Sequence, residues 1–366
     1  MRVGTEAEVA EAVRAARGPL RIVGGGTRGI GACGGEVLEV SGLGGVRLYE
    51  PGALTLEAGA GTRVAEVAAL LAGAGQRLAF EVPDLRGLLG RFGESTLGGV
   101  AAANASGPRR IQVGAARDHL LGLRFVDGRG AVIKNGGRVM KNVTGLDLVR
   151  LVAGSRGTLG VITEVAFKVQ AIPEAEATLV SANMQAEAGL AALTQALGSP
   201  FDVSGAAFWQ GEARIRLEGM AGSVDYRLAA LRAILPGEFR VETGGESAAL
   251  WREIRDVVPF AGTDAEVWRV VLRPSDATGF TRALGQAGLA HRALFDWGGG
   301  LIWIEMQRPA GQALRAVLAG FGGHATVIRG RSGPVFPPQS AAVTRLEAGL
   351  RAEFDPRGIL NAGLMG

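Results

Sequence analysis

Cysteine is almost absent from this 366-residue chain, in which Cys33 is the only one. A single thiol cannot form an internal disulfide, and it cannot hold an iron–sulfur cluster, which takes about four ligands. Histidine occurs only at His119, His291 and His324, which are too far apart to form a local cluster. We therefore predict no metal site, and we interpret Cys33 as a small buried side chain.

Long apolar runs and dense basic runs are also missing. No stretch approaches the roughly 18 apolar residues that span a bilayer, and the start, MRVGTEAEVAEAV, is typical of neither a signal nor a transit peptide. The net charge is +4, but the arginines are scattered among acidic residues, which argues against nucleic-acid binding. We expect a cytoplasmic protein without direct membrane insertion, at most peripheral at the inner membrane through a partner.

Glycine, by contrast, is abundant at 59 residues, and the length of the chain suggests two domains. In the first part, a T-x-x-E capping box at Thr5 predicts a helix that stops at Gly18-Pro19. The further elements expected there are strands at 20–23, 53–58 and within 157–170, a helix capped by Thr62, and a hairpin over 120–134 that turns at 127–130.

The second part combines helices with strands that are joined by short turns. Its expected elements are helices around 190–197 and 224–235 and strands at 214–218, 267–273, 291–296 and 301–306. Short turns between adjacent strands favour an antiparallel sheet with helices on one face. We therefore predict an α+β fold with one domain over 1–172, a second over 173–334 and a C-terminal segment, 335–366, that returns to the first domain.

The Gly-rich stretch RIVGGGTRGIGACGG (21–35) follows a predicted strand and admits three interpretations. Read literally, residues 24–29 match G-x-G-x-x-G, but a Rossmann unit needs a helix next, and the three glycines that follow disfavour one. A P-loop would need Gly-Lys-Ser/Thr, which does not follow. A surface turn without a ligand is the third interpretation.

A second stretch, GESTLGGVAAANASGP (93–108), is also rich in glycine and hydroxyl groups, and it shows no apolar period typical of a helix. Two such stretches, each beside a strand, suit a diphosphate that is held from both sides by backbone N–H groups. Glycine lets the backbone approach phosphate oxygens where a side chain would collide.

Several motifs then occur in one order along the chain: strand-GGGT-x-x-x-G, P-D, S-T-L-G-G, N-A-S-G and F-D-P-x-G-I-L-N. In this order they resemble the FAD-binding flavoproteins of the vanillyl-alcohol oxidase (PCMH) type. A closer resemblance, to the smaller FAD-binding subunits of bacterial glycolate oxidase, is carried by GGRVMKNVTGLD (136–147), LVAGSRGTLG (151–160), DWGG (296–299), GGHAT (322–326) and FDPRG (354–358). It covers nearly the whole chain and implies a two-lobed FAD-binding domain followed by a cap domain.

The resemblance implies a non-covalent FAD, because Thr27 and Arg28 stand where some relatives carry a linking histidine. The residues implied around it are Val23, Gly24, Gly25, Gly26, Thr27 and Arg28 at the pyrophosphate, Pro83 beside the ribityl chain or flavin, Ser95, Thr96, Gly98 and Gly99 across the phosphates, Asn104, Ser106 and Gly107 along the flavin, and Ile162 behind the adenine. Lys141 and Asn142 are implied at the isoalloxazine edge, where a cation stabilises anionic reduced flavin. The alternative for Lys141 is a surface lysine.

One feature of the resembled family is missing. Relatives that oxidise 2-hydroxy acids carry a cluster similar to H-x-G-D-G-N-x-H in the cap, and this chain has no such cluster. Oxidising a hydroxy acid needs a base for its proton, and binding its carboxylate favours an arginine fork. His324 is the candidate base, with a core histidine at a strand start as the alternative, and the candidate arginines are Arg252, Arg255, Arg273 and Arg329.

The resemblance thus implies a redox role as the FAD subunit of a glycolate oxidase complex. The chain would either oxidise glycolate, a small 2-hydroxy acid, or relay electrons between a catalytic FAD subunit and an iron–sulfur subunit. The single cysteine is consistent with a cluster in another subunit. Two alternatives remain: a subunit that serves assembly and whose flavin does not turn over, and an NAD-dependent dehydrogenase.

Overall fold

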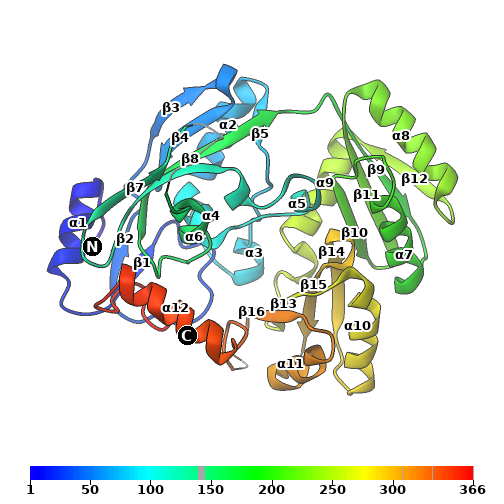
Figure 1. Cartoon of the computed structure of the whole chain (residues 1–366). Helices are drawn as coiled ribbons and strands as arrows, with labels where there is room; N and C mark the ends of the chain where they lie inside the picture. Colours follow the sequence, from blue (N-terminus) through cyan, green and yellow to red (C-terminus); the bar gives the residue numbers. More distant parts are fainter. Residues whose placement is uncertain (139–144, 308, 332, 366) are drawn as a thin grey trace.

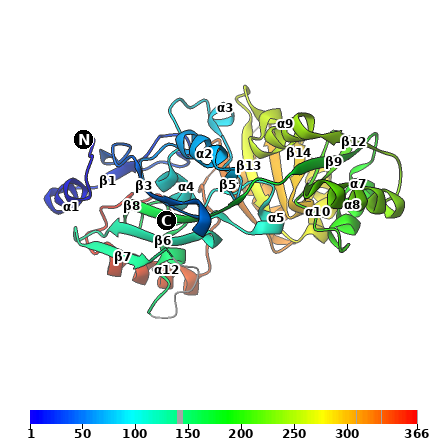
Figure 2. The same cartoon turned by 90° about the horizontal axis from the view of Figure 1, so that it is seen from above.

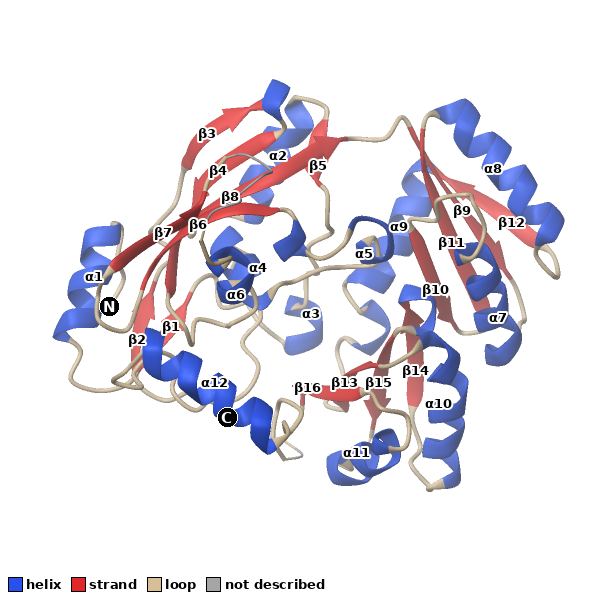
Figure 3. Cartoon of the chain, viewed as in Figure 1, coloured by secondary structure: helices blue, strands red, loops and turns tan. Residues whose placement is uncertain are grey.

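The computed structural model describes residues 1–138, 145–307, 309–331 and 333–365. Figure 1 shows two parts side by side, the first built from the N-terminal half of the chain and the second around one large sheet. The last helix, α12 (Ala341–Phe354), lies against the first part, as Figure 3 also shows. No helix in the described ranges is long and apolar enough to cross a membrane.

A small N-terminal lobe brings both ends of the chain together. Helix α1 (Glu6–Ala15) starts at the predicted capping box, in which the Thr5 side chain accepts a hydrogen bond from the Glu8 N–H at 3.2 Å. Strand β1 (Leu20–Val23) pairs in parallel with β2 (Glu36–Glu39). On its other side, the Leu20 N–H donates to the Ile359 carbonyl at 2.7 Å, so the end of the chain extends this small sheet.

A six-stranded antiparallel sheet, the first sheet, forms the other lobe of the first part. Its strands run in the order β3-β4-β8-β6-β7, and β5 pairs with the far end of β8. The bounds are β3 (Val46–Glu50), β4 (Thr55–Gly59), β5 (Gln76–Leu78), β6 (Leu120–Val126), β7 (Val132–Gly136) and β8 (Val161–Ala171). The predicted hairpin (β6–β7) and the predicted long strand (β8) are both confirmed. The helices of this lobe are α2 (Val64–Gly73), α3 (Arg86–Leu89), α4 (Leu97–Ala103), α5 (Arg110–Val113) and α6 (Leu148–Val152).

Two local predictions in this lobe are wrong. Helix α2 is capped at Arg63 without a side-chain hydrogen bond, because the Thr62 hydroxyl donates to the Gly45 carbonyl at 3.3 Å instead. The stretch 93–108, which shows no helical period, nevertheless contains α4. Its glycines cost about 1 kcal/mol each in a helix, but they allow α4 to pack closely on Ala60, whose carbonyl accepts from the Gly98 N–H at 2.7 Å.

The second part is built on an eight-stranded antiparallel sheet, the second sheet, with the strand order β12-β9-β11-β10-β14-β15-β13-β16. The bounds are β9 (Ala175–Ser181), β10 (Gly205–Trp209), β11 (Glu212–Gly219), β12 (Phe239–Thr243), β13 (Glu266–Val271), β14 (Arg292–Asp296), β15 (Leu301–Met306) and β16 (His324–Arg329). The predicted antiparallel sheet is therefore confirmed. It is wider than the four expected strands, because several short buried strands carry little period of their own.

One face of the second sheet is covered by four helices, α7 (Ala186–Leu197), α8 (Ala221–Ile234), α10 (Ala277–Gln286) and α11 (Gly311–Ala319). A fifth, α9 (Gly244–Arg255), packs on the opposite face (Figure 2). Its Trp251 contacts Gly205 and Arg216 there. The prediction of helices on one face thus describes four of these five helices. The rest of the opposite face, including Trp303 and Ile328, is turned toward the first part.

Candidate cofactor site and inter-sheet cavity

The two glycine-rich stretches meet directly at the end of β1. A Cβ atom on Gly25 would overlap the carbonyl oxygen of Glu94, and one on Gly24 would lie 2.7 Å from the Thr96 hydroxyl. The two stretches that were predicted to hold a diphosphate from both sides therefore lie next to each other, in contact at Gly24 and Gly25. Only turns and bends separate β1 from β2, so the helix that a Rossmann unit requires does not follow the first stretch.

A cavity of about 560 Å³, the glycine-side cavity, opens beside this contact. Backbone and small side chains line most of it, among them those of residues 23–27, Thr96 and Gly99. Asn361 closes its floor, where its side chain accepts from the Ile22 N–H and donates to the Arg156 carbonyl, both at 2.7 Å. Cys33 also lines the cavity and is half-buried, less than predicted; burial raises the pKa of its thiol.

A second cavity of about 590 Å³, the inter-sheet cavity, lies between the first part and the second sheet. Arg28, Ile30, Ala103 and Arg156 line both cavities, which therefore adjoin. The Arg28 guanidinium donates to the Ser95 hydroxyl at 2.6 Å and to the Pro83 carbonyl at 2.7 Å, whereas its Nε has no partner. Burial lowers the pKa of Arg28 to about 10, so it is a cation at neutral pH.

These features fit a dinucleotide such as FAD. The glycine backbone that lines the glycine-side cavity, here called the cradle, lets a diphosphate reach backbone N–H groups, and the partly buried Arg28 beside it supplies positive charge. Pro83, Asn104 and Ser106 line the inter-sheet cavity next to that cradle, where the predicted flavin contacts were placed. The Asn104 side chain is held by the Arg117 N–H at 2.9 Å, so its position is fixed by the backbone.

Other predicted cofactor residues in the described ranges do not line the cavities but are packed against neighbouring elements. Gly98 is buried against Ala60, and Ile162 is buried in the core of the first sheet. A Cβ on Gly107 would lie 2.9 Å from Glu81, and the Gly107 carbonyl accepts from the Trp297 Nε1–H at 3.2 Å. Gly107 therefore joins the two parts. Lys141 and Asn142 lie outside the described residues.

The residues suggested for catalysis do not gather in the inter-sheet cavity. His324 is exposed at the start of β16, and partial burial of its ring and the charge of Arg269 lower its pKa. Arg329 has a structural role: its guanidinium donates hydrogen bonds to the Ala265, Leu88 and Phe260 carbonyls and to the Thr263 hydroxyl. The remaining arginines are exposed or paired: Arg252 is exposed on α9, Arg255 pairs with Asp256, and Arg273 pairs with Asp276.

Three arginines that sequence reasoning missed, Arg110, Arg156 and Arg269, do line the inter-sheet cavity. Arg269 carried a usable signal, because it is the single charge inside the apolar strand VWRVV. A charged residue in such a strand needs a polar surrounding on one face. Arg156 lies within the motif LVAGSRGTLG and Arg110 follows N-A-S-G, but neither is a lone charge in an apolar strand, so neither carried such a signal.

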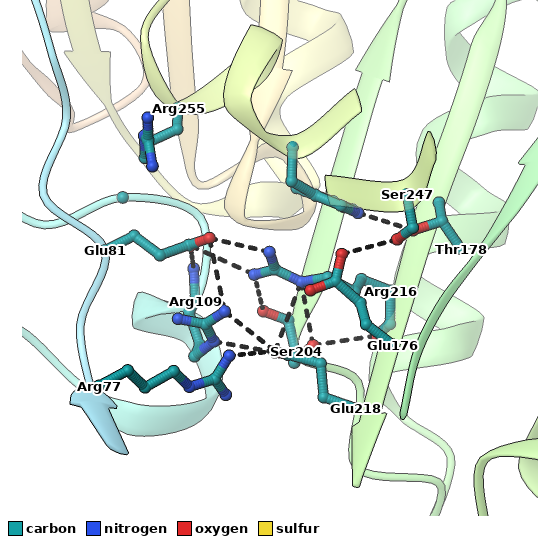
Figure 4. Close-up of polar contacts among 12 residues, drawn as sticks. Arg77, Glu81, Arg109, Glu176, Thr178, Ser204, Arg216, Glu218, Ser247 and Arg255 are labelled. Carbon is teal, nitrogen blue, oxygen red and sulfur yellow. Dashed lines mark hydrogen bonds and ion pairs between the residues drawn. The ribbon is translucent and has the colours of Figure 1, made fainter. Parts of the chain in front are cut away.

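An ionic cluster between the two parts fixes the second sheet over the first (Figure 4). Glu218 of β11 accepts two hydrogen bonds from Arg109, at 2.8 and 2.9 Å, and one from Arg77 at 2.6 Å. Arg216 of the same strand reaches Glu81 at 2.8 Å. Each carboxylate is nearly buried, and the surrounding guanidinium groups hold the pKa values of both below their usual range.

Asp296, in the DWGG motif, gives a testable pH dependence. Its carboxylate is buried and accepts from the Trp297 N–H at 2.7 Å. Burial, with a smaller contribution from Glu81, raises its pKa from 3.8 to about 7, although Arg216 and Arg269 oppose the shift. Between those pH values the folded state binds the extra proton, so the contribution to the free energy of unfolding falls by about 1.4 kcal/mol per pH unit as pH rises.

The variant Asp296→Asn should therefore lose this slope and be more stable than the wild type at pH 8, by about 2 kcal/mol or more. Urea unfolding at pH 5, 6, 7 and 8 measures the difference. Asp225→Asn is the matched control, because Asp225 is exposed on α8. Parallel stability curves for Asp296→Asn and wild type would contradict the raised pKa.

Comparisons with known proteins agree with this geometry. A family model described as "FAD binding domain" matches residues 1–136. Glycolate oxidase subunit GlcE of Escherichia coli (strain K12) is 35% identical over 333 residues, which cover 90% of this chain and 87% of that protein. Glycolate oxidase subunit GlcD of Bacillus subtilis (strain 168) is 42% identical over 87 residues, or 24% of this chain and 18% of that protein.

Among solved structures, an alkyldihydroxyacetonephosphate synthase superposes with a TM-score of 0.70 at 17% identity, covering 99% of this chain and 76% of that one. This likeness shows a shared PCMH-type fold. The similarity to GlcE extends over nearly the whole length of both chains. The chain carries a FAD-binding domain and belongs to the family of the glycolate oxidase subunit GlcE.

Proposed function

We propose that the chain is the FAD-binding subunit of a glycolate oxidase complex and that it holds FAD without a covalent link. The observation that carries the proposal is the contact of Gly24 and Gly25 with residues 94–96, beside the glycine-side cavity, which adjoins the inter-sheet cavity. The full-length similarity to GlcE supports the assignment to this complex. The helix-free first stretch disfavours NAD binding of the Rossmann type.

In this proposal the diphosphate of FAD lies in the glycine-side cavity, with Arg28 and Arg156 as nearby cations. The isoalloxazine lies in the inter-sheet cavity beside Pro83, Asn104 and Ser106. When bound, FAD supplies reversible electron transfer, and the protein excludes water from the ring with Trp303 and Ile328 of the second sheet. The FAD-binding domain would comprise residues 1–172 and 335–366, and the cap domain 173–334.

We infer a relay role rather than independent oxidation of glycolate. Among the described residues that line the inter-sheet cavity, Glu347 is the single carboxylate and no histidine is present. Glu347 forms an ion pair with Arg351 at 3.8 Å. Without a positioned base, proton removal from the hydroxy acid is not assisted. The chain would pass electrons from a catalytic FAD subunit to an iron–sulfur subunit.

The test is an absorbance spectrum of the full chain after incubation with FAD and desalting. Visible flavin bands should be retained, and acid precipitation should release all of the flavin into the supernatant. Anaerobic glycolate should leave the bands of the isolated chain oxidised and should bleach them once the catalytic subunit is added. A folded chain without retained flavin would contradict the FAD assignment, and bleaching by glycolate alone would contradict the relay role.

A further inference from the structure

The inter-sheet cavity has an excess of positive charge that the proposed cofactor site does not explain. Among the described residues, seven arginines and one carboxylate, that of Glu347, line it; the arginines are Arg28, Arg110, Arg117, Arg150, Arg156, Arg269 and Arg351. Within the described residues, Arg110, Arg156 and Arg269 form no ion pair with any carboxylate. Such guanidinium groups in a partly closed cavity favour an anionic ligand.

Two of these arginines converge on one aromatic ring. The guanidinium carbon of Arg110, from α5, lies 4.8 Å from the centre of the Trp297 ring, and that of Arg269, from β13, lies 5.2 Å from it. Trp297 is fixed by its hydrogen bond to Gly107 and by a left-handed backbone with φ of 53°. That conformation costs a non-glycine residue about 1–2 kcal/mol, and such strain is typical of positions that the surrounding structure holds for a purpose.

The second sheet adds a hydroxyl donor next to Arg269. In the antiparallel register Arg269 stands opposite Trp303 on β15 and opposite Thr326 on β16. Paired residues in neighbouring strands point to the same face, so Thr326 lies on the same face of the second sheet as Arg269. Both residues line the inter-sheet cavity. The guanidinium groups of Arg269 and Arg110 and the Thr326 hydroxyl therefore supply hydrogen-bond donors to the lining of this cavity.

We propose that Arg269 and Arg110 form a binding site for the carboxylate of a small 2-hydroxy or 2-oxo acid. A carboxylate matches the guanidinium fork in two parallel hydrogen bonds, and it relieves the repulsion among the clustered cations. That repulsion is evident at Arg269, whose pKa is lowered to about 10 by burial and by Arg110 and Arg156. The ligand class rests on the proposed function, because glycolate and its oxidised product share this carboxylate.

Binding at this site does not require that the chain oxidises the acid, because Arg269 and Arg110 would hold the carboxylate and not the reacting hydroxyl. The site is built by residues of this chain alone, and it is therefore expected with or without FAD. Arg156 lines both cavities, and in the proposed function it lies near the diphosphate of the cofactor. Arg269 and Arg110 are thus positioned for the acid.

The test is isothermal titration calorimetry of the full chain with oxalate, a carboxylate that cannot be oxidised as a hydroxy acid, with and without FAD. Saturable binding is expected in both states, weakened about tenfold or more in Arg269→Gln and in Arg110→Gln. Arg273→Gln is the matched control, because Arg273 is exposed and pairs with Asp276. FAD affinity, measured separately, should change less than about threefold in all three variants.

Three other results would contradict or redefine the proposed carboxylate site, and a fourth would concern only the proposed function. No saturable oxalate binding by a folded chain, or unchanged affinity in Arg269→Gln, would overturn it even when FAD binds normally. Inorganic phosphate that binds as tightly as oxalate would show a phosphate site instead. If Arg269→Gln fails to fold by circular dichroism, Arg269→Lys keeps the charge and removes the fork, and it should still weaken oxalate. A chain that binds oxalate but not FAD would contradict the proposed function alone.

Discussion

Replacing Gly25 with alanine is expected to weaken FAD binding by about a hundredfold or more. The Cβ atom of the variant would overlap the Glu94 carbonyl oxygen, and the neighbouring Gly93 backbone is itself packed on the Gly25 carbonyl. The two glycine-rich stretches must therefore separate. Losing about two charge-assisted hydrogen bonds to the diphosphate, at about 1.5 kcal/mol each, accounts for the predicted factor.

The matched control for this prediction is Gly18→Ala, before β1 and outside the glycine-side cavity. A Cβ on Gly18 meets no atom within 4 Å, and its backbone is not left-handed. Quenching of flavin fluorescence on titration with each apoprotein gives the dissociation constants, and circular dichroism reports folding. Gly18→Ala should bind FAD as the wild type does. Equal affinity for Gly25→Ala and Gly18→Ala would mean that the contact of Gly25 with Glu94 does not form the cofactor site.

The features that sequence predicted well are those set by residues close in the chain. The Thr5–Glu8 capping box fixes the start of α1, and the turn at 127–130 fixes the β6–β7 hairpin. Helix α4 was not predicted because its stability comes from tertiary contacts and not from its own sequence. Its buried face packs into the core of the first sheet, and its first N–H groups bond the carbonyls of Thr62 and Ala60. Tertiary packing thus overrides the unfavourable propensity of glycine there.

The candidate site was likewise predictable from the sequence only in the parts that are formed by residues close together in the chain. The composition of the two glycine-rich stretches was sufficient to expect that both would take part in one diphosphate site, and the structure places them next to each other. The cationic lining of the inter-sheet cavity could not be predicted from the sequence, because it depends on strand register across segments far apart in the chain. Arg269 faces the cavity through the pairing of β13 with β15 and β16, whereas Arg329, four-fold bonded to neighbouring groups, has a structural role. Residue type alone does not distinguish these two arginines.

The ionic cluster between the two parts leads to the second large expected effect. Replacing Glu218 with glutamine should lower the free energy of unfolding by about 3–5 kcal/mol at pH 7. The carboxylate, 4% exposed, is shared by Arg77 and Arg109 and lies 3.6 Å from Arg216. Glutamine of the same shape keeps one oxygen acceptor but leaves three guanidinium groups with less negative charge, and removing one partner of a buried ionic group is costly.

The pH dependence and a matched exposed pair separate this explanation from a general loss of packing. The folded-state pKa of Glu218 is depressed below 4.5, so its contribution is present above that pH and is lost as pH falls; Glu218→Gln should flatten the acid limb of the stability curve. Glu187→Gln removes the exposed pair with Arg282, at 2.6 Å, and should lower the free energy of unfolding far less than Glu218→Gln does, because solvent screens an exposed pair. Urea unfolding from pH 3 to pH 8 measures both variants. If the two variants lose equal stability at pH 7, the buried cluster does not hold the second sheet over the cofactor site, and contacts such as those of Gly107 and Arg329 must do so.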